Sequence, residues 1–339
     1  MKKYVVILLI VLSLPQVLFA GRYAGDFILI GSGVRPLGMG GAFTAVADEG
    51  SAVYWNASGL AQIQDLEFSA MHTFLYDNLA TYDFFSLSIP LPANSAIGLS
   101  FTQLSINDIH IYDEKWIVGD REGVDVRSSD IDLHLTGDPD GSFDSSDQLF
   151  EFAFSKNFSY LWDISWIFFE IPLDFYFGGT FKYIKRDIYK NTGTGMGVDL
   201  SFMVETDFAL LTDIDWLGSI RYGISVQDVA GTSITWDTES RHVDEIITNP
   251  RMGIAVIQPL DFIKSELILA FDWYNMYGYA QSFGAEFDYN DLISISTGIH
   301  EGKFSAGMGL QYREYSLDYA FLTNNDLGSS HRIGLTITF

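Results

Sequence analysis

The sequence contains few groups of residues whose types and spacing could do chemistry. The most suggestive is an acidic run with four aspartates inside ten residues, Asp138, Asp140, Asp144 and Asp147. Closely spaced carboxylates on a turn are the ligands that a hard cation such as Ca²⁺ prefers. The run departs from the EF-hand pattern, because Gly141 comes too early and Leu149 stands where a bidentate Glu would be needed. A solvated acidic loop is therefore the commoner explanation, and a calcium site is the alternative.

Nucleotide binding and catalysis find little support. Gly31-Ser32-Gly33 begins like a dinucleotide-binding loop, but the third glycine is missing and Pro36 stands where the turn would be. The six histidines show no metal-ligand spacing, and there is no G-x-S-x-G nucleophile motif. We therefore expect a protein that is not an enzyme and that holds no cofactor.

The first twenty residues have the form of a cleaved secretory signal peptide. Lysines stand at positions 2 and 3, an apolar run extends from Val5 to Leu14, and Ala20 precedes Gly21. The run is too short to cross a bilayer comfortably, and no later stretch offers the roughly 20 apolar residues that a spanning helix needs. We expect an exported chain that is not a helical membrane protein.

The composition favours strands in a membrane. The chain is 48% hydrophobic and 15% aromatic, yet it carries a net charge of −25 and no cysteine. Alternating strands of a transmembrane barrel produce this combination of apolar and acidic residues without long apolar runs. The acidity argues against nucleic acid as a partner, since a phosphate-binding face needs clustered Lys and Arg. A soluble secreted β protein is the alternative.

Period-two alternation predicts an all-β fold, a transmembrane antiparallel barrel of about fourteen strands. The alternation is clear, for example, over 303–312 and 331–339. We expect strands at 66–76, 80–91, 95–106, 147–158, 172–188, 194–205, 218–229, 250–258, 266–274, 281–289, 292–300, 303–312, 315–322 and 331–339.

Loop lengths predict an orientation for this barrel. The two longest connections, 107–146 and 230–249, are the third and the seventh, whereas the tight ones at 92–94, 290–291 and 313–314 are all even-numbered. Bacterial barrels have long external loops and short periplasmic turns. The odd-numbered connections are therefore expected outside the cell.

A glycine-rich segment precedes the first strand and resembles a known family. Gly31, Gly33, Arg35 and Gly38-Met39-Gly40-Gly41-Ala42 follow the pattern G-x-G-x-R-x-x-G-M-G-G-A, and Ala47-Asp48-Glu49 and Trp55-Asn56-Ala57-Ser58-Gly59-Leu60 come after it. This order resembles the N-terminal plug of FadL-type outer-membrane transporters, most closely their PorV/PorQ-like branch. Ala57 replaces the family's proline, so a looser turn is expected there. Later runs at 195–200, 283–287, 317–321 and 331–333 are similar to strand motifs of PorV-like proteins.

The resemblance implies a signal peptide at 1–20, a plug inside the lumen at 21–63 and a barrel at 64–339. The plug motif would consist of Arg35, Gly38, Gly40, Gly41, Trp55, Asn56 and Gly59. Arg35 would then latch the plug to a carboxylate on an inward-facing position of the wall, with Asp199, Asp272 and Asp318 as candidates. Alternatively, Arg35 is solvated at the periplasmic mouth. The terminal Phe339 closes an alternating strand, and the resemblance implies that it is the insertion signal read by the barrel-assembly machinery.

Two functions follow from the resemblance. In the first, the chain lies in a bacterial outer membrane, surrounded by its lipid, and holds secreted client proteins as a PorV-like component of type IX secretion. In the alternative, it is a FadL-like passive transporter of long-chain fatty acids or other hydrophobic small molecules. The resemblance favours the secretion role, whereas an apolar pocket in the lumen would favour transport.

Overall fold

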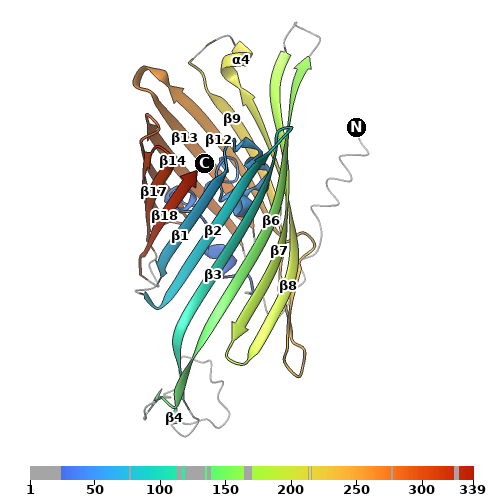
Figure 1. The fold of residues 1–339 in the computed structure, drawn as a ribbon, viewed down its shortest axis with the longest axis vertical. Coiled ribbons are helices and arrows are strands. Elements are labelled where there is room, and N and C mark those ends of the chain that lie inside the picture. The colour runs from blue at the N-terminus through green and yellow to red at the C-terminus, as the bar shows by residue number, and fades with distance from the viewer. Residues whose placement is uncertain are drawn as a thin grey trace.

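The computed structural model describes residues 24–75, 78–112, 117–118, 134–135, 139–163, 170–212, 214, 216–275, 278–323 and 328–339. Fourteen antiparallel strands form a closed barrel, as predicted (Figure 1). The ring closes because the first strand pairs with the last and because β8 pairs with β9. The strands are β1 (Glu67–Leu75), β2 (Ala80–Leu91), β3 (Ser95–Ile111), β6 (Gly141–Asp163), β7 (Glu170–Ile188), β8 (Asn191–Asp207), β9 (Ser219–Gln227), β12 (Asn249–Leu260), β13 (Ser265–Asn275), β14 (Tyr279–Tyr289), β15 (Ile293–His300), β16 (Lys303–Tyr312), β17 (Tyr315–Leu322) and β18 (Ser330–Thr338).

All fourteen predicted strands are present, and several are longer than predicted. Within the long third connection, β4 (Ile117–Val118) and β5 (His134–Leu135) form a separate pair. The seventh connection contains a hairpin of β10 (Thr232–Trp236) and β11 (Val243–Ile246). β10 also pairs with the N-terminal end of β8. The sequence analysis treated this connection only as a long loop.

The two long connections leave the barrel at the same end, here called the long-loop end. Figure 1 shows it at the bottom, marked by β4, with the short helix α4 (Phe208–Thr212) at the opposite end. That opposite end, the turn end, carries the tight turns predicted at 92–94, 290–291 and 313–314, together with η5 (Asp261–Ile263). Which end faces the cell exterior stays a prediction.

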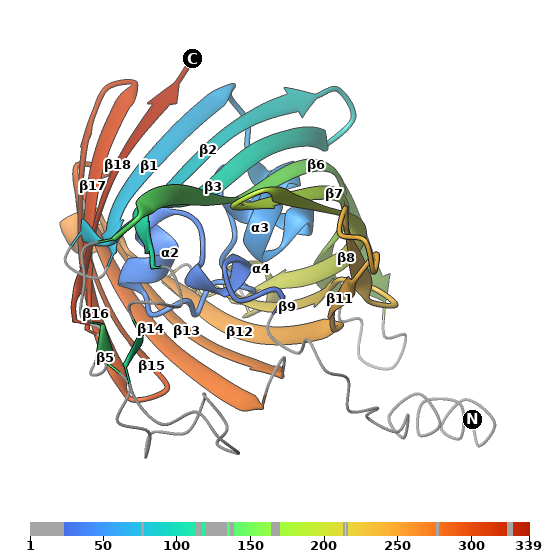
Figure 2. The same ribbon diagram turned by 90° about the horizontal axis from the view of Figure 1, so that it is seen from below.

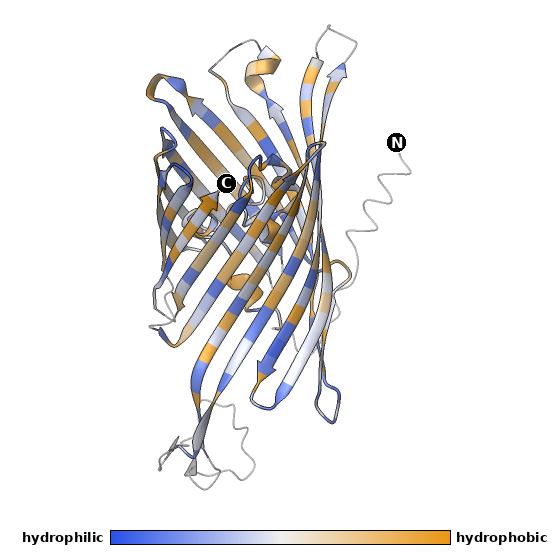
Figure 3. Ribbon diagram, in the orientation of Figure 1, coloured by the Kyte–Doolittle hydropathy of each residue, from blue (hydrophilic) through white to orange (hydrophobic). Residues whose placement is uncertain are grey.

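The side chains alternate between the two faces of the wall as the sequence predicts. On β14, for example, Phe283 is 53% exposed on the outer face, whereas the neighbouring Ser282 is 1% exposed on the inner face. The same alternation appears as bands of colour along the strands in Figure 3. Large apolar side chains therefore cover the outside and mostly small or polar ones line the inside, as in a barrel surrounded by lipid. No helix among the described residues is long and apolar enough to cross a membrane.

The segment 24–63, here called the N-terminal segment, lies inside the barrel. Figure 2 shows its helices enclosed by the ring of strands. Its short helices contact opposite parts of the wall, α2 the strands β15 to β18 and η2 the strands β3, β6, β7 and β8. The helices are η1 (Ile28–Ile30), α2 (Val34–Gly38), α3 (Ala52–Trp55) and η2 (Ala57–Gln62).

Glycines on both sides bring the backbone of this segment against the backbone of the wall. A Cβ added to Gly38 would lie 3.1 Å from the Cα of Gly307, and one added to Gly40 would lie 2.9 Å from the backbone nitrogen of Ile299. On the wall, a Cβ at Gly284 would meet the Met39 carbonyl oxygen at 2.6 Å. The segment and the wall thus touch where neither has a side chain.

Because the two backbones touch, we expect that even a methyl group added to a wall glycine does not fit between the wall and the segment. A Cβ at Gly298 would collide with the backbone of Met39 and Gly40, whereas one at Gly141, also on a strand, has nothing within 4 Å. We expect Gly298→Ala to lower the free energy of unfolding by about 1–3 kcal/mol, the usual cost of overpacking. Gly141→Ala is the matched control, and urea unfolding in detergent compares the two. Equal midpoints would show that the segment is not held against the wall.

Candidate functional site

Two regions between the N-terminal segment and the wall concentrate chemistry. One is a charged cluster around Arg35 near the turn end, and the other is an apolar pocket near the long-loop end. The first fixes the segment in the barrel, and the second offers space for a ligand.

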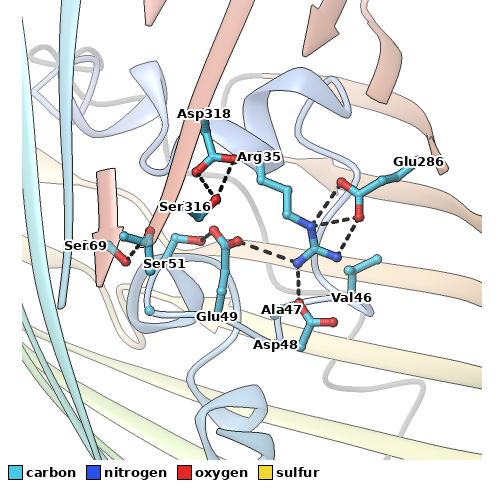
Figure 4. A network of polar contacts seen from close by, with 12 residues as sticks. Arg35, Val46, Ala47, Asp48, Glu49, Ser51, Ser69, Glu286, Ser316 and Asp318 are labelled. Carbon is cyan, nitrogen blue, oxygen red and sulfur yellow. Dashed lines mark hydrogen bonds and ion pairs between the residues drawn. The ribbon is translucent and has the colours of Figure 1, made fainter. Parts of the chain in front are cut away.

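Arg35 stands on α2 and its guanidinium contacts three carboxylates (Figure 4). Its Nε donates to both oxygens of Glu286 at 2.8 and 3.0 Å, and its Nη2 lies 2.8 Å from Glu286 Oε1. On the other side, Nη1 lies 2.5 Å from Asp48 Oδ1 and 3.5 Å from Glu49 Oε2. The fork-shaped contact with Glu286 joins the segment to β14 through a charge-assisted pair.

A second arginine extends this cluster to the opposite wall. Arg221 on β9 approaches Glu205 Oε2 at 3.0 Å and Asp48 Oδ2 at 3.7 Å. Its Nη1 also donates to the carbonyl oxygen of Val46 at 3.3 Å. Asp48 therefore lies between two arginines, and the turn that carries it is tied to both β9 and α2.

The wall partner of Arg35 is Glu286, and none of the three predicted aspartates forms this pair. Asp272 instead accepts the backbone N–H groups of Phe43 at 3.0 Å and Thr44 at 2.8 Å through Oδ2, so it binds the segment by another contact. Asp318 lines the same small cavities as Arg35 but accepts hydrogen bonds from Ser316.

Asp199, the third candidate, lies in a separate buried cluster. Its Oδ1 is 2.7 Å from Lys182 Nζ, and the same Nζ is 2.9 Å from Asp228 Oδ1. The backbone N–H of Asp228 donates to Asp199 at 2.7 Å. These contacts hold the turn that follows β9, where the chain leaves the barrel wall for the β10–β11 hairpin.

The Trp-Asn part of the motif ties the segment to itself and to the wall. Trp55 Nε1 donates to the carbonyl oxygen of Ser32 at 2.7 Å, and Asn56 Nδ2 donates to that of Thr44 at 2.6 Å. Gly41 has a φ of +75° and Gly59 packs on the Ala47 backbone, so both positions suit glycine.

Hydrogen bonds at Ser58 hold the turn after Asn56, and a looser turn than one with proline stays a prediction. Ser58 donates through its hydroxyl to Asn56 Oδ1 at 2.5 Å, and its N–H lies 3.0 Å from Ser201 Oγ. Ser155 Oγ donates to the Ser58 carbonyl oxygen at 2.6 Å. Ser58 thus ties this turn to β6 and β8.

The acidic run does not form the turn that a calcium site would need. Asp138 lies outside the described residues, and β6 begins at Gly141. Asp144 is exposed and accepts the N–H of Asp108, whereas Asp147 is buried and pairs with Arg186 at 2.7 Å. Because alternate residues of a strand face opposite sides, Asp144 and Asp147 cannot share an ion. Among the described residues no group of three or more His, Cys, Asp or Glu could hold a metal.

The ends of the chain leave two predictions untested. The signal peptide lies outside the described residues. Phe339 follows β18, where its N–H donates to the carbonyl oxygen of Leu66 at 2.8 Å and its side chain is exposed. Its role in membrane insertion stays a prediction.

The apolar pocket lies between the N-terminal segment and strands β12 to β17, near the long-loop end. Its cavity volume is about 90 Å³. Apolar side chains from both sides line it together with two cations, Arg251 and Lys303. Its lining also includes Leu29, Ile30, Leu37, Trp55, Tyr274, His300, Phe304 and Leu322.

Several residues of these two regions escaped the sequence analysis. Glu286 appeared only within a strand motif, although its inward register on β14 could have identified it. Arg251 falls beside Pro250 at the start of a strand, and the alternation from Arg251 to Gly253 and Ala255 places it on the inner face. An arginine among small inward residues was the available signal.

The comparisons with known proteins support the fold. Neither a protein-family model nor a curated protein matches the sequence. Among solved structures, the chain is similar to CymD, a monoaromatic hydrocarbon channel, with 11% identity and a TM-score of 0.52 over 92% of this chain and 98% of CymD. The toluene transporter TbuX of Ralstonia pickettii matches with 11% identity and a TM-score of 0.48 over 91% and 97%. A FadL homologue of Pseudomonas aeruginosa matches with 10% identity and a TM-score of 0.44 over 91% and 98%.

The charged cluster predicts that stability depends on pH through Glu49. Burial raises the pKa of the Glu49 carboxyl to about 8, although nearby Arg35 lowers it. Because the pKa is higher in the folded state than in the unfolded state, the contribution of Glu49 to stability is greatest at acidic pH and is lost as the pH rises through about 8. We expect Glu49→Gln to reduce the fall in urea midpoint between about pH 6 and about pH 9.

The matched control is Glu239→Gln, which removes an exposed carboxylate in the β10–β11 turn. It should leave the pH profile of the wild type unchanged. A Glu49→Gln profile that is parallel to the wild-type profile would contradict a half-buried, destabilising carboxylate at this position.

Proposed function

We propose that this chain lies in a bacterial outer membrane and lets hydrophobic small molecules cross it passively, with the apolar pocket as the binding site. Three observations support the proposal. The barrel is closed, its outer face is covered by large apolar side chains, and its fold is similar to that of a hydrocarbon channel. The pocket is the observation that carries the proposal, because a plain structural barrel has no need of an apolar space in its lumen.

The pocket has the composition of a small-molecule site. Ligand sites in proteins are typically concave and mostly apolar, with a few polar groups that orient the ligand. Here aliphatic side chains of the N-terminal segment face aromatic side chains of the wall. Leu29 and Ile30 are half-buried, so they stand where the pocket opens.

The way through the lumen is closed by the N-terminal segment, which acts as a plug in this proposal. Residues 38–59 are held to the wall by backbone contacts at glycines and by Asp272. The stretch before them is joined to the rest at Gly31 and Gly33, which have φ of +84° and +87°. We infer that a ligand passes by displacing η1, which breaks the hydrogen bond from the Tyr54 hydroxyl to the Ile28 carbonyl oxygen, while the remainder of the segment stays in place.

The export role in type IX secretion receives no support from the comparisons. It depended on the resemblance of the sequence to the PorV/PorQ-like branch. The passive-transport alternative fits the fold and the pocket better, and it is the function we propose.

Filling the pocket should abolish ligand binding without disturbing the barrel. Leu29→Trp places an indole in the space that a ligand would occupy. We expect binding of radiolabelled toluene to the detergent-purified protein, measured by equilibrium dialysis, to weaken by at least about tenfold, or about 1.4 kcal/mol.

The matched control is Leu210→Trp on α4, where the leucine is exposed at the turn end. It should bind toluene like the wild type. If Leu29→Trp also binds like the wild type, the pocket is not the site, and if the wild type binds no apolar probe, the transport function is wrong.

A further inference from the structure

We propose that the apolar pocket selects aromatic ligands that carry one carboxylate, which Arg251 and Lys303 bind. This inference rests on the proposed function and specifies the class of ligand taken at that site. It differs from uptake of a neutral hydrocarbon in requiring a cation at a defined place in the lumen.

Arg251 is a buried cation without an anionic partner. The residue is 4% exposed on β12, and among the described residues no carboxylate forms an ion pair with it. Its Nε has no hydrogen-bond partner. Other inward cations behave differently, since Arg35 pairs with Glu286, Lys182 with Asp199 and Arg186 with Asp147.

Two carboxylates on neighbouring elements form no ion pair with Arg251 among the described residues. Asp272 on the neighbouring strand accepts the backbone N–H groups of Phe43 and Thr44 through Oδ2, and its buried Oδ1 has no hydrogen-bond partner. Glu301 is exposed in the β15–β16 turn and lies 3.7 Å from His300 Nε2. The pocket is therefore lined by cations and by no carboxylate, in a chain whose net charge is −25.

Aromatic rings cover the faces of the guanidinium. Its Cζ lies 4.7 Å from the ring centroid of Tyr274, 5.1 Å from that of Trp55 and 5.7 Å from that of Tyr54. Cation–π contacts offset part of the cost of burying the charge. The rings cover the faces of the guanidinium and leave its edge accessible to an anion. A planar carboxylate matches that edge with two parallel hydrogen bonds.

His300 holds the aromatic wall of this site in place. Its Nε2 is 3.0 Å from the Tyr274 hydroxyl, its Nδ1 is 2.9 Å from Ser282 Oγ, and its ring is stacked on Tyr274 at an interplanar angle of 3°. Both ring nitrogens are thus engaged, so His300 orients Tyr274 against Arg251.

The second cation lies at the mouth of the same pocket. Lys303 is half-buried at the start of β16 and forms no ion pair among the described residues. A carboxylate that enters between Leu29 and Phe304 would meet Lys303 first and Arg251 deeper in the pocket. The ligand body would then pack against Trp55 and Phe304, and flat rings suit such a lining.

The test compares two probes with the same apolar body, 4-butylbenzoate and butylbenzene, by equilibrium dialysis with the full-length protein in a non-ionic detergent. We expect wild type to bind the benzoate more tightly than the hydrocarbon. Arg251→Met should weaken benzoate binding by at least about tenfold and leave butylbenzene binding unchanged. Lys303→Met should weaken benzoate binding less.

Arg241→Met is the matched control, since it removes one positive charge from the exposed β10–β11 turn. It should not affect either probe. If Arg251→Met does not fold, Lys303→Met tests the proposal alone, because it replaces a side chain that has no ion pair to lose.

Three results would overturn the inference. They are benzoate binding no tighter than butylbenzene, benzoate binding unaffected by both substitutions, and octanoate binding as tight as that of the aromatic acid. In the first two cases, retained binding of butylbenzene would leave the proposed function standing. Failure of wild type to bind butylbenzene or either acid would overturn both.

Discussion

The structure depends on one constraint, which is that a closed ring of fourteen strands has an interior that must be filled. Closure satisfies the backbone hydrogen bonds of the wall, so no strand edge is left facing lipid. Small residues on the inner face let the N-terminal segment approach until backbone touches backbone, as at Gly38 and Gly307. The segment therefore takes the place of a hydrophobic core, and the position of every other interior group follows from where it packs.

Filling the interior with polypeptide brings polar and charged groups away from water, where each needs a partner. The structure meets this need by pairing across the boundary between segment and wall. Glu286 takes Arg35, and Asp272 takes two N–H groups of the turn at Phe43. Because these pairs are local, each fixes one part of the segment. Arg251 stands out against this pattern, because its Nε has no hydrogen-bond partner and its guanidinium lies against the rings of Tyr54, Trp55 and Tyr274.

The sequence predicted the wall far better than the interior. Strands and their inward faces could be predicted because period-two alternation is a local property, and one face of each strand carries large apolar side chains. The partner of Arg35 could not be predicted, because no local pattern indicates how far the segment reaches into the barrel or which strand it contacts. The acidic run was assigned to a loop because β6 extends past the apolar part of the wall. Gly141, Ser142 and Asp144 are residue types that are common in turns, but here they belong to a strand. The β10–β11 hairpin was missed because its strands are only 5 and 4 residues long and it pairs outside the ring.

The arrangement of the two regions also constrains how a ligand could travel. Beside the pocket, β14, β15 and β16 pair without interruption. The β14–β15 ladder includes His300 at one end and Tyr289 at the other, and the β15–β16 ladder includes Lys303 and Leu310. An exit through this wall would therefore break ladder hydrogen bonds. Towards the turn end, the space beside Arg35 is lined by Glu286, Asp318 and serine hydroxyls, which suits water and disfavours an apolar body. In the proposed function, a ligand in the pocket is therefore blocked by the wall on one side and by the charged cluster on the other. Residues 38–59 are held at glycine contacts along the wall, whereas η1 is tied to the segment by the hydrogen bond from the Tyr54 hydroxyl to the Ile28 carbonyl oxygen. Under that proposal, release requires this hydrogen bond to break.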